Sequence, residues 1–352
     1  MQEAGNVKSE QIQKIIPRIM RDMSDGVLAL DGQGNVLFLN DNGRKMLGKE
    51  EIQEGTKFAS AFFDPSGRDQ NDDFNQFILD AVYDKENTHR GQAAYQLPDG
   101  RIRQLHLTSS FLTGEDGSSS GVVVVFTDVT EVERLHRQRR ESSTIFAVLM
   151  ICVCGYLFLW SLMRYLNIEP PPWAMTLIIE GISILMFIII LKTTSFSLQD
   201  IGLKVKDAKR TFIPDILIAV GGCVIMVVGK IIILKAAPGF FPAGQPFWDW
   251  STATVASVFY PLTVILQEFL ARSVMQVNLK RIFDGKYAGV LSIVVSALVF
   301  GALHVAYGLP LMLGAAVLLG TLGVLFNKQE NIWGVSIVHY AWGEVFGFLG
   351  FM

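Results

Sequence analysis

Residues 121–159, GVVVVFTDVTEVERLHRQRRESSTIFAVLMICVCGYLFL, place three kinds of structure in immediate succession. Residues 121–126 form a β-branched run that is typical of a strand. The charged segment 131–143 is typical of a helix, and the residues from Thr144 onward are apolar over a length that can enter a bilayer. The chain is therefore expected to join a soluble domain that contains β-structure to a membrane domain.

The composition is divided in the same way. The 352 residues are 50% hydrophobic, and most of the charge lies in residues 1–142. The first 14 residues lack the apolar stretch of a signal peptide, so we expect the soluble domain to lie in the cytoplasm. A net charge of −3, with no basic stretch that alternates with aromatic residues, does not indicate a nucleic-acid partner. The cysteines lie in apolar segments and predict neither a disulfide framework nor a zinc site: Cys152, Cys154 and Cys223.

Two hairpins are predicted in the soluble part. The stretch SDGVLALDGQGNVLFLNDNGRKMLG, residues 24–48, contains two short apolar runs around the turn 31–34, followed by a helix that Asn40 or Asp41 can cap. A second hairpin is indicated around Pro98-Asp99-Gly100. The strands are expected at 27–30, 36–39, 93–97, 101–108 and 121–126.

The stretch 24–48 and the closing GVVVVFTDVTEVERL resemble the two ends of a PAS domain, and this resemblance covers residues 18–131. It implies a five-stranded antiparallel sheet with a few helices around a small pocket, and a role in sensing, dimerisation or both. The region has no cysteine of the kind that flavin-binding PAS domains use. His89 and His106 are the residues that a haem would need, but neither lies in a context that predicts a ligand, so the PAS ligand is unknown.

The segment 132–143 connects the two domains, and two interpretations of it are open. A rigid helix would carry a movement of the sensor to the membrane domain. A solvated linker would instead use its arginines to hold the edge of the membrane. The predicted organisation is an N-terminal segment 1–17, an α+β PAS-like sensor 18–131, this connecting helix, and an all-α polytopic domain 144–352.

Seven membrane spans are expected in the second domain, each near the length of about 20 residues that a bilayer requires. They lie at 144–164, 172–192, 212–235, 251–279, 287–304, 308–326 and 331–350.

Charge predicts the orientation of these spans. With the amino terminus inside, the inner flanks carry Arg134, Arg137, Arg139, Arg140, Lys192, Lys204, Lys206, Lys209, Arg210, Lys280, Arg281, Lys286 and Lys328, whereas the outer flanks carry Arg164, Lys230 and Lys235. This asymmetry predicts a multi-pass protein of the inner (cytoplasmic) membrane with a cytoplasmic sensor.

Polar residues inside the spans are costly in hydrocarbon unless they are paired or hydrated. These residues are Glu180, Gln267, Glu268, Arg272, His304, His339 and Glu344. Glu268 and Arg272 are four residues apart on one helical face, so they can form an ion pair. Two histidines and a carboxylate on three separate spans can bind a metal, or can activate a water and support an oxyanion.

The order and spacing of these residues resemble the CPBP family of CAAX proteases and bacteriocin-processing enzymes. That family shows Glu-Glu-x-x-x-Arg, then Phe-x-x-x-His, then His-x-x-x-Asn. This chain has Gln267-Glu268-x-x-x-Arg272, Phe300-x-x-x-His304 and His339-x-x-x-Gly343, and the similarity covers residues 145–350. The resemblance implies an intramembrane endopeptidase that cleaves a hydrophobic or prenylated peptide.

This chain departs from the family pattern at two positions that are thought to take part in the family's reaction. Gln267 stands where the family has the glutamate thought to activate water, and Gly343 stands where it has an asparagine thought to stabilise the oxyanion. Losing a general base typically costs about 10²–10⁴-fold in rate, and losing an oxyanion donor about 10²–10³-fold. Glu268 is a substitute base if its helix is rotated, and Glu344 is a second carboxylate, about 140° from His339 around the helix.

A further constraint is depth in the membrane. Glu268 is expected in the inner half of its span and His304 near the outer end, so they do not meet unless a helix is broken or short. Irregular backbone is tolerated in a membrane protein where it lines a wet cavity.

Two functions from different classes remain. The first is a protease gated by the PAS domain, with Glu268, His304 and His339 in the active site and Arg272 holding Glu268. The second is a catalytically degenerate receptor or scaffold of the same fold that binds a membrane partner without proteolysis. A transporter has little support because the sequence shows no internal repeat.

The remaining expectations concern cofactors and partners. No metal is expected, and zinc, if it is present, would be held by the same carboxylate and two histidines. The expected partners are membrane lipids, a hydrophobic peptide or membrane-protein substrate, and a second copy of the chain bound through the PAS domain and the connecting helix.

Overall fold

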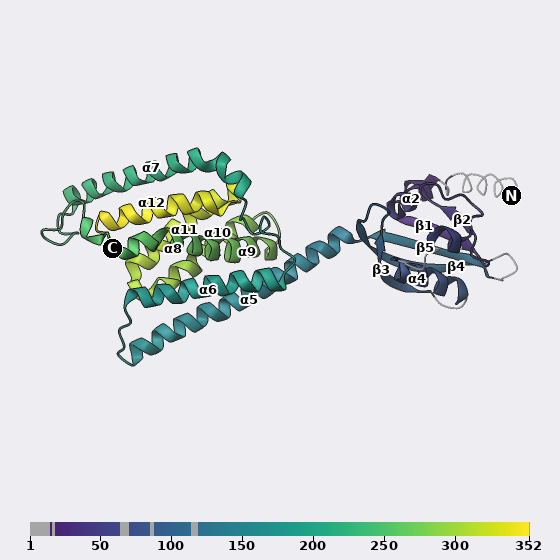
Figure 1. Ribbon diagram of the computed structural model, residues 1–352, viewed down its shortest axis with the longest axis horizontal. Helices are drawn as coiled ribbons and strands as arrows, with labels where there is room; N and C mark the ends of the chain where they lie inside the picture. Colours follow the sequence, from purple (N-terminus) through teal and green to yellow (C-terminus); the bar gives the residue numbers. More distant parts are fainter. Residues whose placement is uncertain (1–14, 16–17, 64–69, 85–87, 114–118, 352) are drawn as a thin grey trace, which may run out of the picture. The chain divides into compact units, whose positions relative to one another are not determined.

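A computed structural model describes residues 15, 18–63, 70–84, 88–113 and 119–351. The chain divides into two compact units, Met1–His136 and Arg137–Met352. Figure 1 shows the first unit as a sheet with short helices and the second as a bundle of long helices. Each unit is described separately below.

The first unit contains the predicted five-stranded antiparallel sheet. The strands are β1 (Gly26–Asp31), β2 (Val36–Leu39), β3 (Arg90–Gln96), β4 (Ile102–Thr113) and β5 (Ser119–Asp128), in the spatial order β2-β1-β5-β4-β3. The helices are α2 (Asp41–Leu47), α3 (Phe58–Phe62) and α4 (Asp72–Tyr83). Both predicted hairpins are confirmed, because β1 pairs with β2 and β3 pairs with β4.

Asn40, not Asp41, caps α2. Its Oδ1 accepts hydrogen bonds from the backbone N–H of Gly43 at 2.8 Å and of Val27 at 2.9 Å, and its Nδ2 donates to the carbonyl of Asp25. One buried side chain therefore bonds a backbone N–H in the first turn of the helix and also connects this turn to the start of β1.

Aromatic side chains fill the space between the sheet and the helices. Phe58 stacks on Phe62 with ring centroids 4.4 Å apart, and Phe74 lies 5.0 Å from Tyr95 and 6.2 Å from Phe126. All five rings are buried. They pack in one core with buried aliphatic side chains of the sheet and helices, and this burial stabilises the unit.

The connecting segment and the first apolar run form one helix. The helix α5 spans Thr130–Tyr165, and Asp128 accepts a hydrogen bond from the backbone N–H of Thr130 at its start. Thr130 in turn accepts a hydrogen bond from the backbone N–H of Gln104 on β4. The continuous helix predicted from the sequence is confirmed, and its first residue is fixed to the PAS-like sheet.

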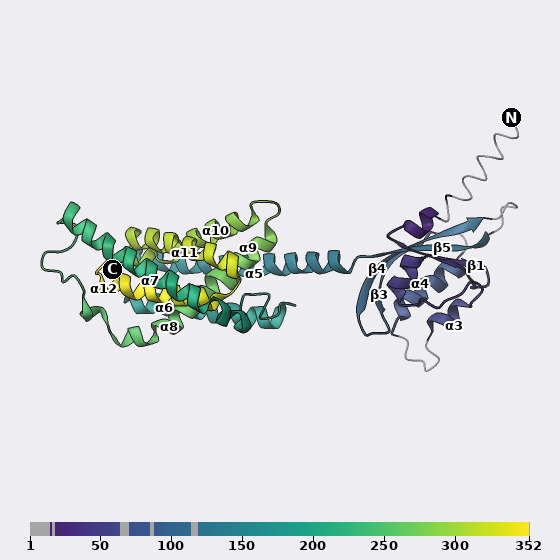
Figure 2. The same ribbon diagram turned by 90° about the horizontal axis from the view of Figure 1, so that it is seen from above.

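The second unit continues with seven further α-helices and one π-helix. They are α6 (Pro172–Thr193), α7 (Val205–Ala236), α8 (Val255–Glu268), the π-helix Phe269–Gln276, α9 (Val277–Ile282), α10 (Ala288–Leu303), α11 (Leu309–Gln329) and α12 (Ile332–Phe348). Figures 1 and 2 show these helices side by side. In this bundle α12 packs against both α7 and α8, and α10 packs against α11.

Within the described residues, five helical stretches are long and apolar enough to cross a membrane. They are Thr130–Tyr165, Trp173–Thr193, Arg210–Ala236, Ser257–Ile282 and Leu309–Gln329. The helix α10 is apolar but has 16 residues, and α12 has 17. The predicted number of seven spans is therefore supported for five of them and stays a prediction for the other two.

At one end of the bundle, ion pairs join α5 and the loops that precede α7, follow α9 and follow α11. Arg139 of α5 pairs with Asp284, between α9 and α10, at 2.8 Å. Lys204, before α7, pairs with Glu330, which follows α11, at 3.0 Å. The hydrogen bond from Lys204 lowers the pKa of the Glu330 carboxyl, which lies outside the apolar helices. These are the connections for which the charge pattern predicts an inner location.

At the other end, Lys230 of α7 is buried and holds the segment before α8 to the end of the chain. Its ammonium donates hydrogen bonds to the carbonyls of Pro246, Phe247 and Leu349 at 3.2, 2.8 and 2.7 Å. It also lies 4.8 Å from the ring centroid of Phe241.

Replacing this lysine tests the contribution of the contact. Lys230→Met removes three charge-assisted hydrogen bonds and leaves their carbonyl acceptors without a partner, so we expect it to destabilise the fold by about 2–4 kcal/mol. Lys235→Met, on the exposed last turn of the same helix, is the control and should match the parent. The measurement is thermal unfolding of the purified protein in detergent, and equal melting temperatures for all three proteins would contradict the assignment.

Candidate active site

The fourth predicted span forms a continuous helix whose second half contains a π-helix. The helix α8 ends at Glu268, the π-helix covers Phe269–Gln276, and α9 follows. All eight residues of the π-helix are buried. The wider turn of a π-helix is uncommon and is often found at functional sites.

The π-helix carries a ladder of polar side chains. Arg272 Nε donates to Glu268 Oε2 at 2.8 Å, and Arg272 Nη1 donates to Gln276 Oε1 at 2.8 Å. Arg272 Nη2 reaches the carbonyl of Leu319 on α11 at 2.8 Å, and Gln276 Nε2 reaches the carbonyl of Gly323 at 2.9 Å. The predicted pair of Glu268 and Arg272 is present, with both side chains fully buried.

Gly323 allows this approach. A Cβ built on Gly323 would lie 2.8 Å from Arg272 Nη1, closer than such atoms come in folded proteins, and 3.2 Å from Gln276 Oε1, which is an unusually tight contact. A side chain at this position would therefore displace the guanidinium that neutralises Glu268.

His339 completes the buried chain of contacts. Its Nδ1 lies 2.7 Å from Glu268 Oε1, and its side chain keeps 5% of its surface accessible. Glu268 is next to an arginine that is always charged, so its carboxylate is ionised and can only accept hydrogen bonds. The hydrogen therefore resides on His339 Nδ1, and in the neutral ring Nε2 is left as a proton acceptor.

His304 lies at the end of α10, on the first residue after the helix. Its Nδ1 lies 3.0 Å from the carbonyl of Phe300, and since a carbonyl only accepts, Nδ1 carries the hydrogen. Within the described residues, no hydrogen bond joins His304 to Glu268 or to Gln267.

Gln267 is buried at the end of α8 and, in the described part of the chain, its amide has no hydrogen-bond partner. One turn earlier, Thr263 donates a hydrogen bond to Glu180 on α6 at 2.5 Å. Glu180 is thus a further carboxylate on the α6 side of α8. The sequence showed it as a polar residue in a span without indicating this contact.

Gly343, at the position of the family's final asparagine, lies against α8. A Cβ built on Gly343, one turn after His339, would lie 2.0 Å from the hydroxyl oxygen of Tyr260 on α8. Among the described residues, Glu344 forms no hydrogen bond to His339, whose Nδ1 is bonded to Glu268. Glu344 therefore does not take the place of the missing asparagine.

The residues named for a zinc site do not form a ligand cluster. Within the described residues, no group of three or more His, Cys, Asp or Glu side chains is arranged to hold a metal ion. Both oxygens of Glu268 are already bonded, one to Arg272 and one to His339.

Sequence reasoning found Glu268, Arg272 and His339 but missed Gln276, Gly323 and Tyr260. The spacing of Gln276, four residues after Arg272, is a usable signal because Glu268, Arg272 and Gln276 then share one helical face. No pattern in the sequence indicates the carbonyls of α11 or the contact between Tyr260 and Gly343.

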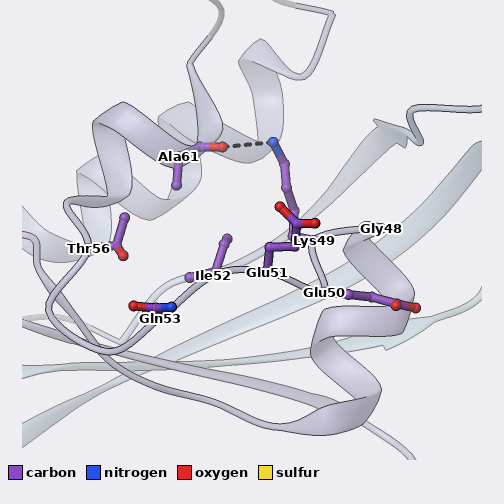
Figure 3. A pocket seen from close by; sticks show the side chains of 8 residues that line it. All are labelled: Gly48, Lys49, Glu50, Glu51, Ile52, Gln53, Thr56 and Ala61. Atoms are coloured by element: carbon purple, nitrogen blue, oxygen red, sulfur yellow. Dashed lines mark hydrogen bonds between the residues drawn. The ribbon is translucent and has the colours of Figure 1, made fainter.

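The PAS-like unit has a surface pocket of about 390 Å³. Figure 3 shows the side chains that line it, with the Lys49 ammonium bonded to the carbonyl of Ala61. The lining residues are Gly48, Lys49, Glu50, Glu51, Ile52, Gln53, Thr56 and Ala61. Neither haem-ligand candidate lines this pocket: His89 pairs with Asp84 at 3.1 Å, and His106 lies on β4.

Comparison with known proteins gives one match for each unit. Residues 15–129 match the family described as PAS fold. Residues 247–343 match the family described as type II CAAX prenyl endopeptidase Rce1-like. The second match includes all of the predicted site residues, from Gln267 to His339.

The similar curated proteins are sensor kinases. The sensor protein kinase WalK of Staphylococcus haemolyticus is 30% identical over 144 residues, and that of Staphylococcus epidermidis is 29% identical over 144 residues. Each match covers 40% of this chain and 21% of the kinase.

The similar solved structures include PAS domains. The PAS domain of Bordetella pertussis BvgS is 19% identical, with a TM-score of 0.29, and covers 36% of this chain and 93% of that chain. The PAS domain of an HTR-like protein from Haloarcula marismortui is 15% identical, with a TM-score of 0.27, and covers 36% of this chain and 98% of that chain. The chain thus joins a PAS domain to a helical membrane domain of the Rce1-like type II CAAX prenyl endopeptidase kind.

Proposed function

We propose that this protein is an intramembrane endopeptidase whose activity is regulated by its PAS domain. The observation that carries the proposal is the buried relay Arg272–Glu268–His339, with contacts of 2.8 and 2.7 Å. The ion pair is electrically neutral, so a neutral imidazole leaves the buried site without net charge. The carboxylate orients the imidazole and stabilises the imidazolium that forms when Nε2 takes a proton, as in a serine protease triad.

The proposed reaction uses His339 as the general base. A water molecule attacks the scissile carbonyl carbon and gives its proton to His339 Nε2, while Glu268 holds Nδ1. The tetrahedral intermediate collapses, the carbon–nitrogen bond breaks, and the imidazolium returns the proton to the leaving amine. His304, whose Nδ1 is held by the carbonyl of Phe300, uses its Nε2 to accept the second hydrogen of the attacking water. The Gln267 amide orients the water or the peptide instead of serving as a base.

The substrate class follows from the surroundings of the site. The relay lies between apolar helices, and the matched family is named for prenyl endopeptidases. A peptide that reaches it must be hydrophobic or carry a lipid. We therefore propose a hydrophobic or prenylated peptide, or a membrane protein, as the substrate.

The proposed location is the inner membrane, with the PAS domain in the cytoplasm. The loops that the charge rule places inside are joined to one another at one end of the bundle. Arg139 contacts Asp284, and Lys204 and Lys280 both contact Glu330, at 3.0 and 3.7 Å. The loops that carry the positive charges are also the loops that contact one another, which supports this orientation.

The proposed route of regulation starts on the connecting helix. Within the second unit, α5 contacts two connections: Arg139 pairs with Asp284, and Glu141 accepts hydrogen bonds from Ser195 N and Oγ at 3.1 and 2.9 Å. Asp284 follows α9, and α9 directly follows the π-helix that carries Arg272. A shift of α5 would therefore move the segment that holds Glu268. This favours the rigid-helix interpretation of the connection.

The connecting helix is also the proposed site of self-association. Val132 and Leu135, three residues apart on α5, are each 53% exposed. An apolar pair on an exposed helical face is a typical surface for pairing with a second copy of the same helix.

The second candidate function is a degenerate receptor or scaffold of the same fold. Gln267 and Gly343 favour it, because each lacks a group on which the family pattern depends. The assay below separates the two functions.

We expect the purified protein to cleave prenylated or hydrophobic peptides. His339→Ala should lower kcat by about 10²–10⁴-fold, because it removes the general base. His136→Ala, on the exposed part of α5, is the matched histidine control and should cleave at the parent rate. Product formation is measured by mass spectrometry.

Two further variants make this test decisive. Gln267→Glu restores the carboxylate of the family pattern and should raise the rate. No cleavage by the parent together with cleavage by Gln267→Glu would contradict retained proteolysis and favour the scaffold. Cleavage by the parent and by both His304→Ala and His339→Ala at equal rates would remove the assigned site.

The route of regulation is tested by exchanging charges. Arg139→Glu places two acidic groups together and should change the cleavage rate by about two- to fivefold, because an exposed ion pair is worth up to about 1 kcal/mol. Arg139→Glu combined with Asp284→Arg restores the attraction and should return the rate to the parent value. Arg137→Glu, on the same exposed helix, is the control. A double variant as altered as Arg139→Glu would argue against this contact.

A further inference from the structure

The space beside Gly343, which has no side chain, is filled by a residue of another helix. A Cβ built on Gly343 would lie 2.0 Å from Tyr260 Oη, 2.9 Å from Cζ and 3.1 Å from Cε1. The phenol end of Tyr260 therefore occupies the space that any side chain at position 343 would need. Tyr260 and Gly343 are complementary, and a residue larger than glycine at position 343 requires the phenol to move.

Tyr260 lies on the same face of α8 as Gln267. The two residues are seven positions apart, which is two helical turns with an offset of about 20°. On the facing helix α12, Gly343 follows His339 by four residues and so shares its face. The hydroxyl of Tyr260 is thus placed along the same seam between α8 and α12 as the relay.

The phenol lies beside a second tyrosine, on the facing helix. Its ring centroid is 5.8 Å from that of Tyr340 on α12. In the described part of the chain, no protein group accepts or donates a hydrogen bond at Tyr260 Oη. A half-buried hydroxyl in this position has its O–H available to a bound molecule.

We propose that the Tyr260 hydroxyl stabilises the oxyanion of the tetrahedral intermediate, a role that rests on the proposed peptidase function. A neutral phenol is a strong hydrogen-bond donor, and a donor placed beforehand in a site of low dielectric stabilises the charge that develops on the carbonyl oxygen. The proton of the phenol stays on Tyr260 throughout, so the transfer of the water proton to His339 is unchanged.

This role explains why glycine is found at position 343. An asparagine there would bring its own amide donor but would overlap the phenol, so the two donors exclude each other. The chain carries the combination of tyrosine on α8 and glycine on α12. The hydrogen-bond donor that the family has at this position of α12 is then supplied by Tyr260 on the facing helix α8.

The test compares ground-state and tetrahedral ligands on the full-length protein. Tyr260→Phe should lower kcat by about 10²–10³-fold, with KM changed less than about twofold, because the donor acts on the intermediate only. Its affinity for a phosphinate analogue of the substrate peptide should fall by about the same factor as kcat, while its affinity for the product peptide stays the same. Tyr287→Phe, an exposed tyrosine before α10, should match the parent in every measurement.

The outcomes separate this proposal from the peptidase function. If the parent cleaves the peptide and Tyr260→Phe does so at the same rate, the role of Tyr260 is overturned and the peptidase function stands. If the parent does not cleave, both are overturned. If kcat falls but phosphinate and product affinities fall equally, Tyr260 acts in general packing and the proposal is overturned.

Discussion

The buried ion pair between Glu268 and Arg272 is the interaction on which the rest of the membrane domain depends. Both side chains have no exposed surface, and an unpaired charge at such a depth would cost several kcal/mol. Each remaining hydrogen-bonding position must therefore find a partner. Gln276, the carbonyls of α11 and the imidazole of His339 supply them.

This requirement accounts for several local features together. The π-helix sets Arg272 between Glu268 and α11, and Gly323 leaves room for the guanidinium. The same contacts hold His339 in one tautomer, because a carboxylate can only accept a hydrogen bond. The contacts that reduce the cost of burying the charges are thus also the contacts that orient the proposed general base. Stability and chemistry share one set of hydrogen bonds.

The two substitutions in the family pattern have different consequences in this arrangement. Gly343 is matched by the phenol of Tyr260, so that the space of the missing side chain is filled by another hydrogen-bond donor. Gln267 has no such counterpart among its contacts in the described residues, and in the proposed mechanism the base is instead the imidazole that Glu268 contacts. The connecting helix contacts the segment after the π-helix through the ion pair of Arg139 and Asp284, and the proposed route of regulation depends on this contact.

The sequence by itself determined most of the helices and hairpins, and within the candidate site it determined the pair of Glu268 and Arg272. The two hairpins, a helix cap at Asn40 or Asp41 and the helix α5 follow from local patterns, because most of their hydrogen bonds join residues close in the chain. The pairing of β1 with β5 joins residues about 100 positions apart and does not follow from a local pattern. The spacing of Glu268 and Arg272 predicted their pair. Only the tertiary structure decided that Glu268 binds His339 and that Tyr260 meets Gly343. These contacts join residues 71 and 83 positions apart, and helix packing, which no local pattern encodes, brings them together.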